Sequence, residues 1–309
     1  MSQSSTLPAR HDHLDGLALG LMILICASWG LNQVAVKIAG DGISPIWLAT
    51  LRSAGGTVLM VTWMLWRNIP IFSRDGSLGV GLLMGFIFAV EFILFYWGMT
   101  FTTVSRGVLF FYMSPFAVAI GAHFFIRGER LTQRKLVGLC LAFTGLGLAV
   151  YEGLTFPTYR ELIGDGMIFF AAVLWGIQTV LFKAGRLSAI APEKTLLYEL
   201  GVSALLMPLA LLFVSERGIF SPSMLVWACV AYQIIVIVFA SYIGWLWLVV
   251  RYPASHLASF SFLVPVLGFL GGAVLLNEEI SPLLLGTVTL ICSGIYIVSR
   301  SDRPKSAAA

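Results

Sequence analysis

The sequence is organised around the stretch Ser28-Trp29-Gly30-Leu31-Asn32-Gln33-Val34-Ala35-Val36-Lys37, which occurs a second time in related form. The second form is Leu174-Trp175-Gly176-Ile177-Gln178-Thr179-Val180-Leu181-Phe182-Lys183. The tryptophan, the glycine and the lysine of the second form each lie 146 positions after their counterparts. In both forms a Trp-Gly pair is followed by polar side chains and then by a single lysine. A repeat at about half of the chain length indicates two copies of one structural unit.

The composition predicts an integral membrane protein. Of the 309 residues, 59% are hydrophobic and 11% are charged, whereas a soluble domain carries roughly 25% charged residues. Apolar runs recur from end to end with about the length that crosses a bilayer. The runs are continuous rather than alternating, which favours a bundle of helices over a membrane barrel. We predict ten spans, at residues 17–36, 46–66, 77–98, 104–125, 132–151, 163–183, 193–214, 223–248, 255–275 and 282–299.

The distribution of lysine and arginine predicts the orientation of the chain. With a cytoplasmic N-terminus, 14 of these residues lie at the inner side and 4 at the outer side, and Arg52 falls within a span. Cytoplasmic loops carry the excess of basic residues, so both termini are expected inside. Residues 1–16 are expected to be a disordered cytoplasmic N-terminus and residues 300–309 a cytoplasmic tail. The net charge of +4 reflects this asymmetry, so no nucleic-acid partner is expected.

Five spans in each half predict an inverted repeat, because an odd number of crossings makes the second copy enter from the opposite side. The halves are residues 17–151 and 163–299. The fold class is therefore an all-α integral membrane protein of about ten transmembrane helices, built as an inverted 5+5 repeat.

Matching prolines and glutamates support the repeat. Pro115 and Pro265 lie 150 positions apart, and so do Glu129 and Glu279. A proline inside a span removes a helix hydrogen bond and kinks the helix, so the two prolines are candidate hinges. Each glutamate follows an apolar helix, and we expect it to cap the helix that comes next. Glycines in the helices that follow, at Gly138, Gly145, Gly147, Gly286 and Gly294, should let helix backbones approach closely.

These features resemble the drug/metabolite transporter superfamily, and specifically its ten-helix branch with two EamA domains. The resemblance rests in the first half on Trp29-Gly30, Lys37, Pro45, Arg52, the block from Tyr96 through Pro115, Glu129 and Gly138. In the second half it rests on Trp175-Gly176, Lys183, Arg251-Tyr252-Pro253-Ala254-Ser255, Pro265, Glu279 and Gly294. Within the superfamily the chain is most similar to bacterial exporters of aromatic and other amino acids. One departure is Tyr198, followed by Glu199, at the position that matches Arg52.

Three charged residues inside the spans are functional candidates, because a charge in the bilayer costs roughly 2.5–3.5 kcal/mol on insertion scales. Arg52 and Glu91 are expected at equal depth, either as an ion pair that locks two helices or with one partner on the substrate path. Glu199 is expected near the inner face, where it either contacts His256 or Arg251 at the mouth of the path or reaches water on its own.

Aromatic and amide side chains in the middle of the spans predict a cavity for a small zwitterion with an apolar side chain. The candidate substrate-binding residues are Trp29, Gln33, Glu91, Phe95, Tyr112, Trp175, Gln178, Tyr242, His256 and Phe260. The candidate gating or structural residues are Arg52, Glu199, Pro115, Pro265, Glu129 and Glu279.

The leading functional hypothesis is an inner-membrane exporter of amino acids that works by alternating access. The sequence contains no G-x-x-x-x-G-K-[ST] motif, so transport is expected to be secondary or facilitated. Export of cationic drugs or of another metabolite is the alternative. A sugar phosphate is disfavoured because Arg52 is the only deep basic residue, and a membrane-embedded enzyme because HExxH, GxSxG and clustered Asp/His are missing from the spans.

The expected partners are amino acids and the lipid bilayer, with no cofactor and a monomeric chain. The four cysteines, Cys26, Cys140, Cys229 and Cys292, have the spacing of neither a metal site nor a disulfide framework.

The orientation can be tested by labelling single cysteines from outside the cell. Cysteines at Gly42 and Thr158 should react with an impermeant thiol reagent, and a cysteine at Gln133 should react only after the membrane is opened. The opposite labelling pattern would overturn the predicted orientation.

Overall fold

The computed structural model describes residues 14–73, 75–151, 154, 156–276 and 282–300. The first half forms α1 (Gly16–Gly40), α2 (Pro45–Trp66), α3 (Leu78–Met99), α4 (Val104–Phe111), α5 (Ser114–Phe125) and α6 (Gln133–Val150). The second half forms α7 (Tyr159–Ala184), η2 (Arg186–Ala189), α8 (Pro192–Ala210), α9 (Met224–Tyr232), the π-helix η3 (Gln233–Ser241), α10 (Tyr242–Arg251), α11 (Ala254–Phe260), α12 (Leu263–Leu276) and α13 (Pro282–Ser299). Within these ranges no strand occurs, and a single antiparallel bridge joins Ile43 to Ile219.

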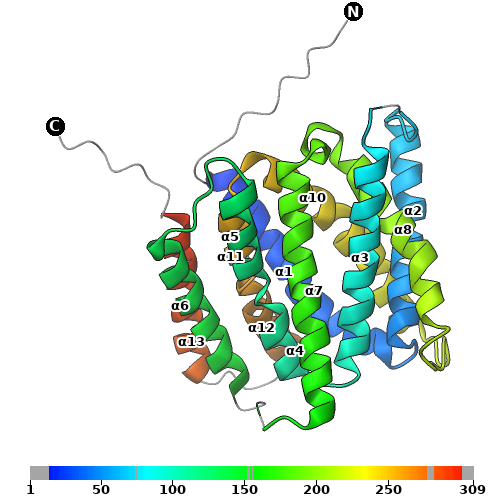
Figure 1. Cartoon of the computed structure of the whole chain (residues 1–309). Helices are drawn as coiled ribbons and strands as arrows, with labels where there is room; N and C mark the ends of the chain where they lie inside the picture. Colours follow the sequence, from blue (N-terminus) through cyan, green and yellow to red (C-terminus); the bar gives the residue numbers. More distant parts are fainter. Residues whose placement is uncertain (1–13, 74, 152–153, 155, 277–281, 301–309) are drawn as a thin grey trace, which may run out of the picture.

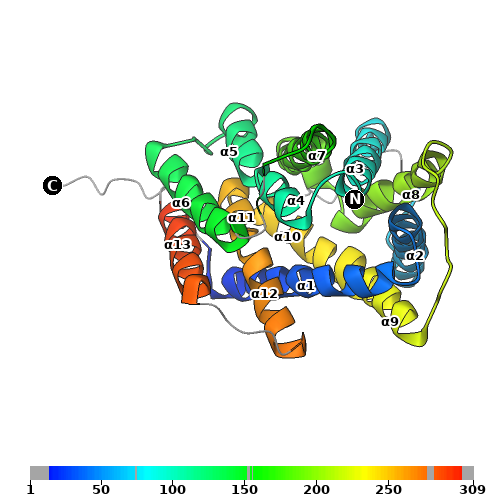
Figure 2. The same ribbon diagram turned by 90° about the horizontal axis from the view of Figure 1, so that it is seen from below.

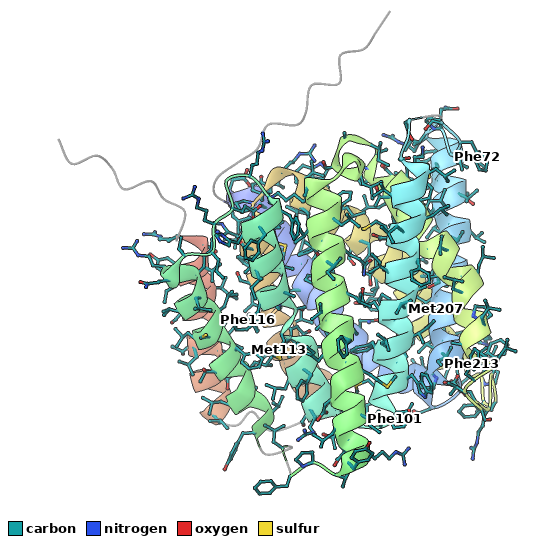
Figure 3. The ribbon with its side chains drawn as sticks, in the orientation of Figure 1. Phe72, Phe101, Met113, Phe116, Met207 and Phe213 are labelled. Atoms are coloured by element: carbon teal, nitrogen blue, oxygen red, sulfur yellow. The ribbon has the colours of Figure 1, made fainter. Side chains whose placement is uncertain are left out.

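The helices form one bundle that suits a membrane. Seven helical segments are long and apolar enough to span a bilayer, counting α4 with α5 as one segment and α9 through α10 as another. Large apolar side chains such as Phe124, Leu205 and Phe170 point outward, where a soluble protein would place polar ones. Figure 3 shows Phe72 and Phe213 projecting at opposite ends of the bundle, whereas Met207 is buried. The prediction of a helical membrane protein is therefore confirmed.

Helices distant in sequence pack side by side. The packed pairs include α1 with α12, α6 with α13, α3 with α7 and α2 with α8, so each pair joins one helix from each half of the chain. The view along the bundle in Figure 2 shows α6 and α13 together at one side and α2 with α8 at the other. The first described residues of α1 and the last of α13 lie at the same end of the bundle, which is here called the terminus end (Figure 1).

Glycines permit the closest of these approaches. A Cβ added to Gly138 would lie 2.7 Å from the backbone oxygen of Gly294, and one added to Gly294 would lie 2.5 Å from the oxygen of Gly138. Gly145 also faces α13 at short range. Gly147 and Gly286 would meet nothing within 4 Å, so the expectation of close packing is wrong for these two residues.

Two spans are broken in the middle rather than only kinked. α4 ends at Phe111 and α5 begins at Ser114, so Pro115 occupies the first turn of a new helix. In the same way α11 ends at Phe260, and α12 begins at Leu263 with Pro265 in its first turn. Proline fits a first turn because that position requires no amide hydrogen bond. The predicted kinks are therefore complete interruptions of the helix.

The predicted labelling site Gly42 proves unsuitable. Gly42 is buried in the turn after α1, and an added Cβ would lie 2.3 Å from the backbone oxygen of Ser221. The neighbouring Asp41 is exposed and lies in the same turn, so Asp41→Cys is the better variant. Thr158 and Gln133 are both exposed and can be used as planned.

The contact between α6 and α13 gives a stability prediction. Gly138→Ala should destabilise the protein by about 1–3 kcal/mol, because the new methyl group collides with the backbone of α13. Gly147→Ala, in the same helix, is the matched control. It should be neutral or stabilising, since alanine is the better helix former and nothing opposes its methyl group. Thermal unfolding in detergent compares the two, and equal midpoints would show that the crossing of α6 and α13 is not tightly packed.

Candidate functional site

A large cavity lies in the centre of the bundle. Its lining comes from α1, α2, α3, α4, α5, α7, α8, η3, α10 and α12 and from the breaks between α4 and α5 and between α11 and α12. The space between the lining atoms, with its opening to solvent, amounts to about 1260 Å³.

The cavity is closed on the terminus side. Met84, Phe182 and Val249 form its lining toward the termini, and each is at most 1% exposed. Gln33, in the half of α1 nearer the opposite end, is exposed. The structure therefore represents a state in which the cavity is sealed from one side of the bundle.

Aromatic rings make up much of the wall. Trp29 and Trp175, which match each other in the two halves, both contact Trp245, with ring centres 5.6 and 5.3 Å away. Tyr242 meets the ring of Trp29 edge on at 6.2 Å. The indole Nε1 of Trp29 donates a hydrogen bond of 2.8 Å to the hydroxyl of Ser241, the last residue of the π-helix η3. π-helical turns occur often at functional sites, and here the turn places Ser241 against the repeated tryptophan.

Eight of the ten candidate substrate-binding residues line this cavity: Trp29, Gln33, Glu91, Phe95, Tyr112, Trp175, Gln178 and Tyr242. Arg52 and Glu199, predicted as gating or structural residues, line it as well. His256 and Phe260 are described, but neither belongs to the lining. His256 is fully buried in α11. The backbone oxygen of Phe260 accepts a hydrogen bond from the thiol of Cys26 in α1. Both side chains are therefore buried between helices and lie outside the cavity lining.

The expected ion pair between Arg52 and Glu91 is not formed. Glu91 instead accepts a hydrogen bond from the side-chain amide of Gln178 in α7. The guanidinium of Arg52 stacks on the ring of Phe92, with its central carbon 4.1 Å from the ring centre. Both side chains line the same cavity, but Glu91 contacts Gln178 and Arg52 contacts Phe92.

The expected contacts of Glu199 are not formed either. Among the described residues Glu199 has no ion pair or hydrogen bond. Arg251 lies over the ring of Trp247, with its central carbon 4.0 Å from the ring centre, and donates to the backbone oxygen of the same residue. Glu199 therefore lines the cavity and does not form the expected contact with His256 or Arg251.

Glu129 closes the terminus end through a network that joins three elements. Its carboxylate lies 2.8 Å from the ammonium of Lys183 at the end of α7, which also donates to the backbone oxygen of Tyr252. The same carboxylate accepts hydrogen bonds from the backbone amides of Ala254 and Ser255. Glu129 thus caps α11, which is distant in sequence, and the expectation that it caps the next helix is wrong. The cap of α6 is Thr132, whose side chain accepts from the amide of Lys135. Glu279 lies outside the described residues.

The surroundings of Glu129 shift its pKa. Burial alone raises the pKa of this carboxyl, but the charge of Lys183 and the hydrogen bonds from Lys183, Ala254 and Ser255 outweigh burial and hold the pKa below its usual value. The carboxylate is therefore ionised at neutral pH and stabilises the closed terminus end.

A second ion pair lies at the same end. The buried ammonium of Lys194, in the first turn of α8, lies 2.6 Å from the carboxylate of Asp75 in the loop before α3. It also donates to the hydroxyl of Ser73. The hydrogen bond from Lys194, with those from Ser73 and Ser77, lowers the pKa of Asp75. This pair ties the beginning of α8 to the loop between α2 and α3.

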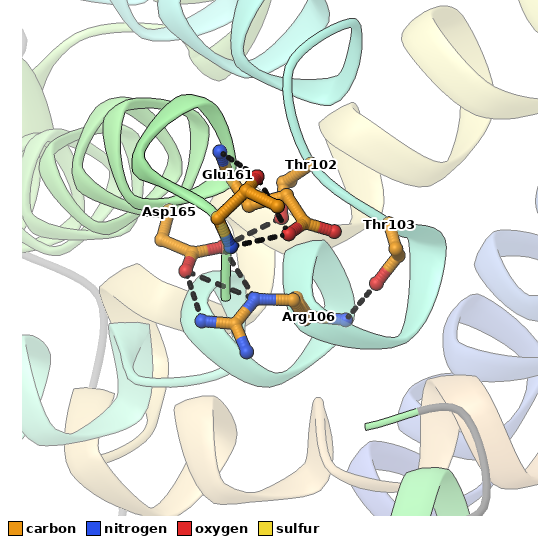
Figure 4. Close-up of polar contacts among 6 residues, drawn as sticks. Thr102, Thr103, Arg106, Glu161 and Asp165 are labelled. Carbon is orange, nitrogen blue, oxygen red and sulfur yellow. Dashed lines mark hydrogen bonds and ion pairs between the residues drawn. The ribbon is translucent and has the colours of Figure 1, made fainter. Parts of the chain in front are cut away.

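A third ion pair lies at the opposite end, between Arg106 of α4 and Asp165 of α7 (Figure 4). The Nε of Arg106 donates to Asp165 at 3.0 Å, and the hydroxyl of Thr102 donates to the same carboxylate at 2.7 Å. The sequence analysis missed this pair. A signal was present, because each residue lies two positions after the start of its predicted span and both spans start on the same side of the membrane.

The comparisons with known proteins agree with this architecture. A model of the EamA-like transporter family matches residues 16–151 and 162–300. An uncharacterised transporter of Archaeoglobus fulgidus is 29% identical over 91% of this chain and 98% of its own length. A probable amino-acid metabolite efflux pump of Escherichia coli is 26% identical over 90% of this chain and 93% of its own length. One crystal structure, at 18% identity, superposes with a TM-score of 0.80 over 92% of this chain and 96% of that one, which shows a shared fold.

The pairing of Glu129 with Lys183 gives a testable prediction. Glu129→Gln should destabilise the protein by about 3–5 kcal/mol, because it leaves the ammonium of Lys183 buried without its counter-charge. Adding Lys183→Met should recover part of this loss, whereas Asp41→Asn, at an exposed carboxyl, should change little. Because the folded pKa of Glu129 lies below the unfolded value, its contribution is complete above the unfolded pKa and is lost as the pH falls through the folded pKa.

Thermal unfolding in detergent as a function of pH measures both effects. The wild type should lose stability on acidification more steeply than the double variant does. Identical pH profiles, or additive losses in the two single variants, would show that the pair does not stabilise this end.

Proposed function

Because the chain belongs to the EamA-like transporter family, we propose that it exports amino acids, including those with large aromatic or apolar side chains. The observation that carries this proposal is the aromatic wall of the central cavity, with Trp29, Trp175 and Tyr242 around it. Such a wall suits an apolar side chain, and the charged and amide groups beside it suit a zwitterion. The name of the Escherichia coli relative, a probable amino-acid metabolite efflux pump, supports the same substrate class.

The mechanism that we propose is alternating access in an inverted repeat of ten crossings. The two broken helices support it, because α4 with α5 and α11 with α12 interrupt at matching positions of the two halves. A break in a helix lets its two parts move separately. The ion pairs Glu129–Lys183 and Lys194–Asp75 hold the terminus end closed, and they would open when the cavity faces that side. Arg106–Asp165 would hold the opposite end.

We further propose that the chain resides in a bacterial inner membrane with both termini in the cytoplasm. The basic residues support this orientation, since 14 of them fall on the proposed inner side. In this orientation the structure represents an outward-open state. Transport would be driven by a gradient of the substrate or of an ion.

Export of cationic drugs is the second candidate function. One observation favours it, since the two carboxylates of Glu91 and Glu199 face the cavity with the single guanidinium of Arg52. A cationic dye could pair with one of these carboxyl groups.

The proposal predicts transport by the purified protein. Proteoliposomes should move labelled phenylalanine, and flux of a cationic dye or a sugar phosphate without flux of any amino acid would refute the substrate class. Trp175→Ala should raise the KM for phenylalanine about fivefold, because loss of about 50 Å² of apolar contact weakens binding by about 1 kcal/mol. Phe170→Ala, on the exposed face of the same helix, is the matched control and should leave the KM unchanged.

Insertion and folding of both variants are checked by size-exclusion chromatography. An unchanged KM in a folded Trp175→Ala variant would remove this ring from the binding site.

A further inference from the structure

A basic and an acidic side chain, Arg52 and Glu199, line the cavity without an ion-pair partner among the described residues. Arg52 is 2% exposed, and its Nε and Nη2 atoms have no hydrogen-bond partner within the described part of the chain. Glu199 is 5% exposed and, as described above, makes neither an ion pair nor a hydrogen bond there. A buried charge without a partner is costly. Both groups are therefore available to pair with a ligand.

The two side chains line the same cavity but do not satisfy each other. No contact within 4.0 Å joins the guanidinium to the carboxylate, although both residues are described. A donor group and an acceptor group therefore border the same cavity as the rings of Trp29 and Tyr242.

Glu91, the other carboxylate of the cavity, has a different role. It already accepts a hydrogen bond from Gln178, which fixes its position against α7. Glu199 is therefore the carboxylate that remains available to a ligand, and Arg52 is the guanidinium.

We propose that Arg52 and Glu199 form the head-group site for an α-amino acid, an inference that rests on the proposed function. The guanidinium of Arg52 binds the α-carboxylate, because its planar donors match a carboxylate with two parallel hydrogen bonds. The carboxylate of Glu199 binds the α-ammonium. The side chain of the ligand then lies against the aromatic wall. The substrate class is narrowed to amino acids in which both charged groups are free.

This assignment separates the amino acid from the other candidate ligands. A cationic drug satisfies Glu199 but leaves Arg52 without an acceptor beside a second positive charge. A phosphate satisfies Arg52 but meets the carboxylates of Glu199 and Glu91. A zwitterion pairs with both groups and adds no net charge to the cavity.

The first test uses the wild-type protein and ligand analogues. Unlabelled phenylalanine, phenylalanine amide and N-acetylphenylalanine compete with labelled phenylalanine for flux in proteoliposomes. The amide lacks the carboxylate and the acetyl derivative lacks the ammonium. Each analogue should inhibit about 10- to 100-fold more weakly than phenylalanine, the range expected for loss of one charge-assisted hydrogen bond.

The second test assigns each charged group of the ligand to its residue. In the Arg52→Gln variant, phenylalanine amide should inhibit as well as phenylalanine does, whereas N-acetylphenylalanine should still inhibit more weakly. Glu199→Gln should show the reverse pattern. If a residue had a merely structural role, its substitution would weaken inhibition by all three compounds to the same extent. Arg67→Gln, an exposed arginine at the end of α2, is the control and should behave like the wild type.

The outcomes distinguish the two proposals. If the wild type moves no amino acid, the proposed function fails and the head-group site fails with it. If the wild type moves phenylalanine but both analogues compete as well as phenylalanine does, the head-group site is refuted while the function stands. Because this comparison uses the wild type, it decides the question even if Arg52→Gln does not fold. Equal weakening of all three ligands in both variants would also refute the assignment.

Discussion

In a lipid bilayer every backbone amide and carbonyl needs a hydrogen-bond partner within the protein, and the rest of this structure depends on that constraint. It explains why helices extend through almost the whole described chain. It also makes the two interruptions informative, because unpaired backbone is tolerated at membrane depth only where it is packed or lines a cavity. Tyr112 and Ser114 border one interruption, Ser261 and Val264 border the other, and all four line the central cavity. The breaks and the cavity are therefore one feature of the architecture.

The same constraint divides the buried charges into two groups. At the ends of the bundle, Glu129 with Lys183 and Arg106 with Asp165 are paired and hydrogen-bonded, so they join helices that would otherwise have to bury single charges. In the cavity, Arg52 and Glu199 form no ion pair with any described residue. A pair at the end of the bundle needs no ligand, whereas Arg52 and Glu199 are the groups that we propose to bind one.

The close contacts between helices follow from small residues rather than from hydrophobic burial, because lipid solvates apolar surface as well as another helix does. Gly138 and Gly294 bring the backbones of α6 and α13 together, and Gly30 does the same for α1 against α12, where an added Cβ would lie 2.7 Å from the amide nitrogen of Gly268. Large apolar side chains face outward on the same helices. These close helix contacts therefore depend on glycine, which has no side chain, at a few positions.

The sequence by itself determined the membrane class, the helical segments, the irregular positions near Pro115 and Pro265, and five of the aromatic residues that line the cavity. These features follow from local composition and from the repeat, which a sequence displays directly. The partners of charged and polar side chains were decided only by the tertiary structure. Depth along a helix predicted that Arg52 and Glu91 lie at the same level and can pair. In the structure Glu91 instead accepts a hydrogen bond from Gln178 of α7, and Arg52 stacks on the ring of Phe92. Glu129 contacts α11, and His256 lies outside the cavity lining, because the rotation of a helix about its axis and the choice of neighbour depend on every helix packed around it.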